Sequence, residues 1–292
     1  MSKVANAFFL AFQHLAPKQL ITRAAGYLAD RPMGEFTTFV INRFINRYSV
    51  DMDLAAEPSP SSYETFNRFF TRPLREGVRP VDPRDDAVVF PVDGAVSQAG
   101  RIQNGRIIQA KGFDYSLNTL LGGDRSVSAP FQDGSFITVY LSPKDYHRVH
   151  MPFDGRLMKT VFVPGRLYSV NPLTVSSIDG IFARNERVAC IFDTAFGPMA
   201  LVMVGATVVG SMETVWAGQI RGKTIAVTDH APENRCFRKG EEIGRFRLGS
   251  TVICCFPKDV IRFEESVKEL AVTQMGGIMA RLISGSSESK QA

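Results

Sequence analysis

Between residues 86 and 262, short apolar runs alternate with glycine and proline residues, and this pattern limits the fold more than any other feature of the sequence. The runs FITVYL at 136–141 and RVACIF at 187–192 have the length and composition of buried strands. A strand, a turn at Lys239-Gly240 and a second strand are expected over residues 238–256. We therefore expect a body of short antiparallel strands whose core resembles that of a β-barrel or β-sandwich.

The chain divides into three regions, which together predict the α+β class. Residues 1–50 are helical in pattern, residues 51–84 form a proline-rich connector, and residues 85–292 form the β-rich domain. Within the connector, a short helix is expected around residues 63–70. The final segment, residues 267–282, is expected to form a strand and then a helix.

The N-terminal region combines aromatic residues with most of the excess positive charge. Apolar residues recur at helical spacing over residues 4–15, and further helices are expected over residues 18–28 and 36–45. Residues 1–48 hold six lysine and arginine residues against two acidic residues. Aromatic, basic helices of this kind bind the surface of an anionic membrane. Helices packed on a core with solvated basic faces would give the same pattern, so the sequence leaves both interpretations open.

Composition excludes few classes of protein. The net charge of +5 at pH 7 suits an anionic partner, either a lipid surface or a nucleic acid. The four cysteines form no C-x-x-C pair, so we expect reduced thiols, no zinc site, and buried roles for Cys254 and Cys255. Residues 198–210 are too few to span a membrane and are expected to form a buried pair of strands. The polar tail, residues 284–292, is expected to be disordered.

Three short motifs supply residue types that nucleophilic catalysis uses. FPVDG places Asp93 at the end of an apolar strand, YHRVHMP places His147 and His150 after another strand, and LGST places Ser250 at the start of a third. A hydroxyl, an imidazole base and a carboxylate form a charge relay on any fold and in any chain order. Taken singly, the aspartate also fits a turn, and the histidines also fit ordinary buried residues or an incomplete metal site.

In their order and spacing, the three motifs resemble those of the bacterial phosphatidylserine decarboxylases. The resemblance covers nearly the whole chain, from the basic helical N-terminus through the β-rich body to the late LGST motif and the short tail. It implies an enzyme whose cofactor is pyruvate, present as a covalent pyruvoyl group that forms from a serine of the chain, and which uses no metal. It also implies a precursor that cleaves itself between the glycine and serine of LGST, which are Gly249 and Ser250 here.

The resemblance gives each motif a role. Asp93, His150 and Ser250 are implied to form the charge relay for self-cleavage, with His150 as the base. Ser250 becomes the pyruvoyl group at the head of an α chain, residues 250–292. This α chain forms a heterodimer with the β chain, residues 1–249, and a dimer of such pairs is also allowed. The ketone then forms a Schiff base with phosphatidylserine, and loss of CO2 yields phosphatidylethanolamine.

Further residues are implied to contact the substrate. His147 resembles the family histidine that lies near the substrate, and it is expected to act in decarboxylation. Tyr140, Ser169 and Asn171 are candidates for lining the headgroup pocket. Tyr140 fits a strand aromatic equally well, and the other two fit a turn before Pro172.

A diacyl lipid as substrate also implies where such an enzyme works. Its acyl tails leave the bilayer at a cost of about 0.8 kcal/mol per CH2 group, so the protein has to approach the membrane. The helices of residues 1–50 are expected to bind that anionic surface. We expect a peripheral protein on the cytoplasmic side of the cell inner membrane, with no nucleic acid as partner.

Two other classes of protein fit part of the sequence. A membrane-associated serine hydrolase would use Asp93, His150 and Ser250 without self-cleavage, and it would remain a single 32.3 kDa chain. A lipoyl- or biotin-carrier domain would explain the KGEEIGRF hairpin at residues 239–246, although no lysine stands at a turn tip in the M-K or D-K context. Two separate fragments in the purified protein would exclude the hydrolase, and failure to release CO2 from phosphatidylserine would favour the carrier domain.

Overall fold

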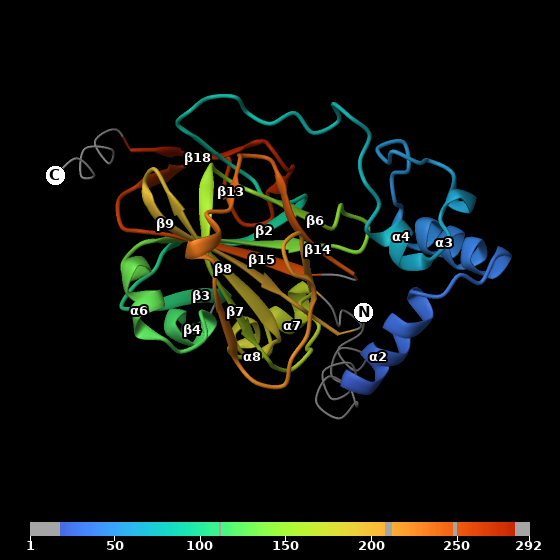
Figure 1. Ribbon diagram of the computed structural model, residues 1–292, viewed down its shortest axis with the longest axis horizontal. Helices are drawn as coiled ribbons and strands as arrows, with labels where there is room; N and C mark the ends of the chain where they lie inside the picture. Colours follow the sequence, from blue (N-terminus) through green and yellow to red (C-terminus); the bar gives the residue numbers. More distant parts are fainter. Residues whose placement is uncertain (1–17, 111, 208–211, 248–249, 284–292) are drawn as a thin grey trace.

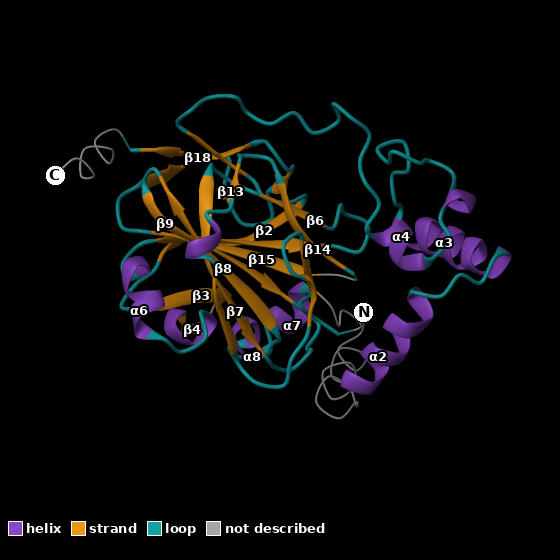
Figure 2. Cartoon of the chain, in the orientation of Figure 1, coloured by secondary structure: helices purple, strands orange, loops and turns teal. Residues whose placement is uncertain are grey.

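A small helical part lies beside a larger β-rich body, as the sequence predicts for the α+β class (Figure 1). The computed structural model describes residues 18–110, 112–207, 212–247 and 250–283. The helix expected at residues 4–15 and the tail at 284–292 lie outside these ranges. In Figure 2 the longer helices gather on one side of the strands, and short helices lie along another face.

The helical part confirms the helices expected at residues 18–28 and 36–45. A small apolar cluster of Ile41, Val50, Tyr63 and Phe69 holds it together. Glu35 in the first turn of α3 favours helix formation, because its negative carboxylate lies at the positive end of the helix dipole. The elements are α2 (Lys18–Ala29), α3 (Glu35–Tyr48), the 3-10 helix η1 (Pro60–Ser62) and α4 (Phe66–Phe70).

A nine-stranded antiparallel sheet forms the centre of the β-rich body. Its order is β12, β7, β8, β9, β15, β5, β2 and β17, and β13 pairs with β7 beyond this path. Strand β15 is buried at every residue because it lies in the middle of the sheet. The strands are β2 (Gly94–Arg101), β5 (Ser135–Leu141), β7 (Gly155–Val163), β8 (Arg187–Thr194), β9 (Gly197–Val204), β12 (Ala226–Asp229), β13 (Cys236–Phe237), β15 (Ser250–Phe256) and β17 (Val272–Thr273).

Short helices cover one face of this sheet. Leu117, Leu120 and Phe182 from the helices pack against Val202 and Ile253 of the strands in one apolar cluster. The elements on this side are the hairpin of β3 (Arg106–Ala110) and β4 (Phe113–Ser116), followed by α5 (Leu117–Leu120), α6 (Arg125–Ser128), η2 (Ala129–Phe131), α7 (Pro172–Val175) and α8 (Ile181–Arg184).

Two smaller sheets cover the opposite face, and the largest apolar cluster lies between them and the central sheet. Phe192, Val252 and Phe256 of the central sheet join Phe246 and Met279 of the small sheets in this cluster. One small sheet has the order β1, β18, β16, and the other has the order β11, β10, β14, β6. Their strands are β1 (Ala87–Val89), β6 (Arg148–His150), β10 (Met212–Thr214), β11 (Gly218–Ile220), β14 (Glu242–Phe246), β16 (Ile261–Phe263) and β18 (Ile278–Leu282), and η3 (Ala231–Glu233) lies before β13.

The barrel-like core expected from the sequence is not found. Among the described strands, the central sheet is open, with β12 and β17 at its two edges. The layered arrangement buries both faces of this sheet without closure, because helices cover one face and small sheets the other.

The helix expected at the end of residues 267–282 is wrong. This segment forms β17 and β18 instead, separated by a turn at Gly276-Gly277. Gly276 has a φ of 85°, which interrupts any helix there. Strand β18 then pairs with both β1 and β16, so tertiary pairing decides its conformation.

Three other expectations need smaller corrections. The described part of residues 198–210, which is 198–207, supplies one buried strand, β9, and its two neighbours β8 and β15 lie outside this range. The turn at Lys239-Gly240 joins β13 to β14, and β15 is not the partner of β14 but belongs to the central sheet. The helix expected at residues 63–70 begins only after Thr65, whose hydroxyl caps it by accepting a hydrogen bond from the backbone N–H of Arg68.

The burial expected for Cys254 and Cys255 is confirmed. Cys190, Cys254 and Cys255 are buried, Cys236 is exposed, and all four are free thiols. In the described part of the chain, no helix is both long enough and apolar enough to cross a bilayer.

Candidate active site

Three strands of the central sheet bring their ends together at the candidate site. Strand β15 begins with Ser250, which pairs with Leu141, the last residue of β5. Tyr140 pairs with Thr251 on one side and with Ala95, near the start of β2, on the other. The first residues of β2 and β15 and the last residues of β5 therefore lie at the same end of these three strands.

Ser250 is fully buried, as the pattern of the sequence predicts for the first residue of a buried strand. Among the described residues, its Oγ has no hydrogen-bond partner. A buried hydroxyl without a partner is uncommon and suggests a functional role. Thr251 shares this property, so position distinguishes Ser250: it directly follows Gly249, and cleavage is expected between these two residues. Gly249 itself lies outside the described residues.

Asp93 lies immediately before β2 and is buried. A Cβ atom on the next residue, Gly94, would come within 2.3 Å of the carbonyl oxygen of Tyr140, so only glycine lets this chain approach β5 so closely. The carboxylate accepts three hydrogen bonds from Arg79 at 2.6–3.0 Å and one from the backbone N–H of Met275 at 2.8 Å. It is therefore held on two sides.

His150 ends strand β6, and its ring is fixed by two hydrogen bonds. Nδ1 lies 2.8 Å from the carbonyl oxygen of Gly240, and Nε2 lies 3.0 Å from the hydroxyl of Tyr146. A carbonyl only accepts, so Nδ1 carries the proton, and the lone pair of Nε2 accepts a hydrogen bond from the Tyr146 hydroxyl. Burial lowers the pKa of His150, which keeps the ring neutral and able to accept a proton near pH 7.

Asp93 and His150 are neighbours in the structure without a direct hydrogen bond between their side chains. The backbone N–H of His150 donates to the carbonyl of Pro91 at 2.9 Å, which places β6 beside the segment that carries Asp93. Yet Asp93 binds Arg79 and Met275, and His150 binds Gly240 and Tyr146. The fold brings the expected relay residues to one region, and their direct relay contact stays a prediction.

His147 lies just before β6 and is fully buried. Its ring stacks on Phe70 of α4, with centroids 4.1 Å apart and an angle of 22°. The backbone N–H of Phe246 donates to its carbonyl at 2.9 Å, four residues before Ser250 in the chain. Burial, followed by the nearby charge of Arg72, lowers the pKa of His147 to about 3. Its nitrogens lie near the backbone of residues 142–143, without well-formed hydrogen bonds.

The three candidate pocket residues differ in their positions. Tyr140 pairs with Thr251, the residue after Ser250, and burial raises the pKa of its hydroxyl. Asn171 caps helix α7 by accepting a hydrogen bond from the backbone N–H of Thr174, and Ser169 accepts one from the backbone N–H of Asn171. The last two residues therefore have a local structural role, which fits the alternative interpretation as turn residues.

Sequence reasoning did not identify several polar residues around the site. Arg79 lies in the connector, where nothing in the pattern marks it. Tyr146 and Gly240 hold His150 through contacts that only the fold creates. Asp145 accepts a hydrogen bond from the backbone N–H of Ser142, and burial raises its pKa. The local pattern Ser-Pro-Lys-Asp at 142–145 is typical of a turn and could have indicated this last contact.

The helical part contacts the site directly. Phe70 stacks on His147, and the carbonyl of Thr71 accepts a hydrogen bond from Arg148 at 2.9 Å. Arg247, three residues before Ser250, forms an ion pair with Asp30 at 3.0 Å. In Figure 1, strands β6 and β14 lie on the side of the body that faces α3 and α4.

The side chains present can perform nucleophilic chemistry at a peptide bond. A hydroxyl, a neutral imidazole and a carboxylate lie around one end of the central strands, largely shielded from water. Within the described ranges, no group of three His, Cys, Asp or Glu side chains is arranged to hold a metal ion.

Comparison with known proteins identifies the class first. A family model described as phosphatidylserine decarboxylase matches residues 66–281, and a second model, described as PSD, matches residues 8–49. The chain belongs to the phosphatidylserine decarboxylase family.

Individual relatives agree over nearly their full length. The chain is 52% identical over 279 residues to a phosphatidylserine decarboxylase proenzyme of Idiomarina loihiensis, covering 93% of this chain and 95% of the relative. It is 50% identical to a proenzyme of that name from Aliivibrio fischeri, over 94% of this chain and 98% of the relative. It is 53% identical to one from Acidovorax ebreus, over 92% and 95%. All three names describe a precursor.

Proposed function

We propose that this protein is a phosphatidylserine decarboxylase that matures by cutting its own chain between Gly249 and Ser250. Family membership over most of the chain supports the activity. The single observation that supports the cleavage position is the buried Ser250 hydroxyl, which has no partner among the described residues and stands at the first position of β15.

Self-cleavage is an acyl shift followed by an elimination. Ser250 Oγ attacks the carbonyl carbon of Gly249 while His150 Nε2 accepts the hydroxyl proton. The acyl group moves from the nitrogen to the oxygen of Ser250 and leaves an ester. Loss of the α-proton of Ser250 expels the carboxylate of Gly249 and leaves a dehydroalanine. Water then replaces its nitrogen, ammonia is released, and a pyruvoyl group caps residues 251–292.

The residues around Ser250 fit such a group. It would stand at a buried strand end, beside Leu141 and Tyr140 and in the same region as both histidines. The ketone supplies an electron sink for the bond that breaks when CO2 leaves. His147 is proposed to hold or transfer the proton that returns to the substrate carbon, because its ring is buried and neutral and its backbone carbonyl pairs with Phe246, four residues before Ser250.

The two fragments are proposed to remain one heterodimer. Strand β15, in the C-terminal fragment, pairs with β5 on one side and β9 on the other, and both of these belong to the N-terminal fragment. Strand β18 pairs with β1 in the same way. Separation would expose a wholly buried strand, so the contacts between the fragments are core contacts.

Residues 1–50 are proposed to hold the enzyme on an anionic membrane, as a peripheral protein on the cytoplasmic side of the inner membrane. Several large apolar residues of α2 and α3 are exposed, and Arg31, Arg43 and Arg47 lie on the same segment. This combination suits a lipid surface. The stacking of Phe70 on His147 links the helical part to the site. The exposed apolar residues are Tyr27, Leu28, Phe36, Phe39 and Tyr48.

Intact-mass measurement of the purified chain tests this proposal. Two masses are expected, one for residues 1–249 and one for residues 250–292 with a pyruvoyl group in place of the serine. Ser250→Ala should give one uncleaved chain of about 32.3 kDa that is folded and releases no CO2 from phosphatidylserine. Thr251→Val is the matched control, because it removes the neighbouring buried hydroxyl, and it should still be cleaved. An active wild-type enzyme with residues 249 and 250 still joined would refute the proposal.

A further inference from the structure

Residues 78–84 of the connector, called the strap here, pass beside the candidate site and pack against the turns at Gly240 and Gly276. A Cβ atom on Gly240 would come within 2.5 Å of the Val81 side chain, and one on Gly276 within 2.7 Å of the Pro80 carbonyl. The backbone N–H of Asp82 donates to the carbonyl of Gly276 at 2.9 Å. The strap therefore lies between two close-packed turns.

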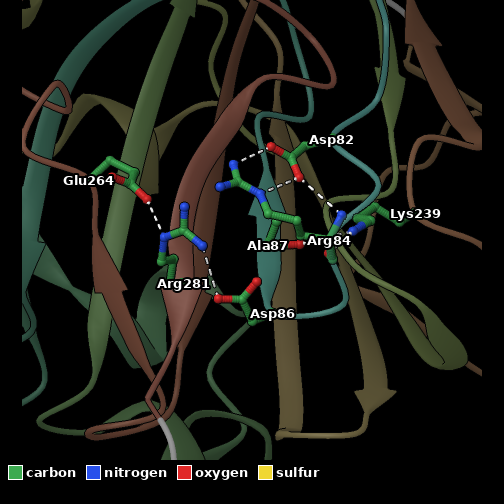
Figure 3. Close-up of polar contacts among 7 residues, drawn as sticks. All are labelled: Asp82, Arg84, Asp86, Ala87, Lys239, Glu264 and Arg281. Atoms are coloured by element: carbon green, nitrogen blue, oxygen red, sulfur yellow. Dashed lines mark hydrogen bonds and ion pairs between the residues drawn. The ribbon is translucent and has the colours of Figure 1, made fainter.

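Lysine 239 and its neighbours fix the outer end of this strap, as Figure 3 shows. The Nζ of Lys239 donates to the carbonyl of Arg84 at 2.5 Å. The guanidinium of Arg84 pairs with Asp82, and its side chain is about half exposed. Arg84 thus belongs to the surface of the strap, away from Asp93.

Arg79, at the inner end of the strap, points the other way. Its Nε lies 3.0 Å from both carboxylate oxygens of Asp93, and its Nη2 lies 2.6 Å from Oδ2. Its remaining nitrogen, Nη1, donates to the carbonyl of Val78 at 2.9 Å. Both side chains of this ion pair are about nine-tenths buried. A buried carboxylate is stable in its charged form only with such a partner.

Both parts of the precursor hold Asp93. Arg79 belongs to the fragment 1–249, whereas Met275, whose N–H donates to Oδ1, belongs to the fragment 250–292. The turn that contains Met275 is the one packed against the strap at Gly276. The carboxylate is therefore oriented only when the C-terminal segment has docked against the strap.

We propose that Arg79 is a positioning residue for self-cleavage, which holds the buried carboxylate of Asp93 in a fixed orientation beside the segment that carries His150. This inference rests on the proposed function, since it assigns Arg79 a part in the maturation step. Without the guanidinium, the carboxylate would keep only its hydrogen bond from the backbone N–H of Met275, and its orientation would be lost. The other titratable groups that face Asp93 are Arg72, Asp145, Tyr146 and His150.

Cell-free synthesis of the full chain, followed by gel analysis of the two fragments over time, tests this role. Cleavage of Arg79→Gln is expected to be about tenfold slower at neutral pH, a part of what an acid–base group contributes. Arg84→Gln, with the same charge change on the same strap, should match the wild type.

Arg79→Lys keeps the charge without the two-pronged contact, so its cleavage rate should lie between those of Arg79→Gln and the wild type. A wild-type rate for Arg79→Gln, or a rate for Arg79→Lys as low as that of Arg79→Gln, would overturn the inference. If Arg79→Gln does not fold, Arg79→Lys decides, and a wild-type rate for it would refute the positioning role. Failure of the wild type itself to cleave would instead refute the proposed function.

Discussion

The Nδ1 atom of His150 lies 2.8 Å from the carbonyl oxygen of Gly240. This backbone acceptor fixes the tautomer of His150 without a carboxylate, and it leaves Nε2 as the basic nitrogen. Gly240 is the residue whose turn packs on the connector strap, so the orientation of the base depends on the same turn that positions the strap. In this structure, the histidine and Asp93 are each held by their own set of contacts.

Two of the buried histidines, His147 and His150, predict a loss of stability in mild acid. The pKa of His147 is lowered to about 3 and that of His150 is also lowered, in both cases chiefly by burial. In the unfolded chain these rings would take up protons below about pH 6.5, so each contributes a stability that is present at neutral pH and lost as the pH falls. The loss per histidine is at most about 1.4 kcal/mol for each pH unit.

Urea unfolding from about pH 8 down to about pH 5 measures this loss. The Ser250→Ala precursor is the suitable background, because a single uncleaved species unfolds. Adding His147→Gln should reduce the slope of stability against pH, because one proton-binding group has been removed. An unchanged slope would contradict the assignment of His147 as a neutral buried ring.

The sequence predicts those parts of this protein that depend on local pattern. The apolar run after Ser250 predicts a buried strand, and the structure confirms it as the centre of the main sheet. The helical periodicity at residues 18–28 is confirmed in the same way. In contrast, a strand and then a helix are expected over residues 267–282, and the helix is not found. A short apolar segment carries too little periodicity to separate helix from strand, and pairing with β1 and β16 decides the conformation of β18.

The site shows the same division between local and distant effects. Residue types in the motifs indicate Asp93, His150 and Ser250, and the fold places their segments around one end of the central strands. The partners that hold these residues come from distant parts of the chain, as Arg79 does for Asp93 across 14 positions and Gly240 does for His150 across 90. No local pattern specifies such contacts, because they depend on how the strap and the turns pack.

The two histidines of the YHRVHMP motif are predicted to have separate roles. His147→Ala should still be cleaved into two fragments, because its ring makes no contact with Asp93 and stacks on Phe70 instead. Its decarboxylation of phosphatidylserine should fall by about a hundredfold or more, the usual contribution of a proton-transferring group. Gel analysis and CO2 release measure the two steps separately.

His230→Ala is the matched control for this comparison. His230 is also buried, but it pairs with Glu233 near β13, and its loss should leave both steps near their wild-type rates. An uncleaved His147→Ala chain would contradict the separation of roles.

Thiol reactivity should follow burial. Burial raises the pKa of Cys190 and of Cys255 to about 12 and that of Cys254 still further, so these three remain protonated and shielded. Only Cys236 is exposed. Under native conditions a thiol reagent should therefore modify one cysteine, and in urea it should modify all four. Cys236→Ser should abolish the native reaction, and rapid native labelling of that variant would show that the central sheet opens.

Exposed phenylalanines of α3 are predicted to bind the membrane. Phe36 and Phe39 are 55% and 64% exposed, although residues of this size normally gain about 1.5–3 kcal/mol each on full burial. Phe36→Ser combined with Phe39→Ser should weaken sedimentation with phosphatidylglycerol vesicles by about tenfold or more. Added salt should weaken binding further, because Arg43 and Arg47 act through screened charge.

Two exposed apolar residues serve as the control for Phe36 and Phe39: Val227 lies in the edge strand β12, and Ile225 directly precedes this strand. Ile225 and Val227 are 52% and 58% exposed, similar to the two phenylalanines, but they lie in the β-rich body. Serine at both positions should leave vesicle binding unchanged if the helical part forms the contact. Because the phenylalanines lie outside the apolar core clusters, their replacement should also leave self-cleavage intact. Equal loss of binding in both double variants would show that the lipid surface contacts the protein without preference for α3.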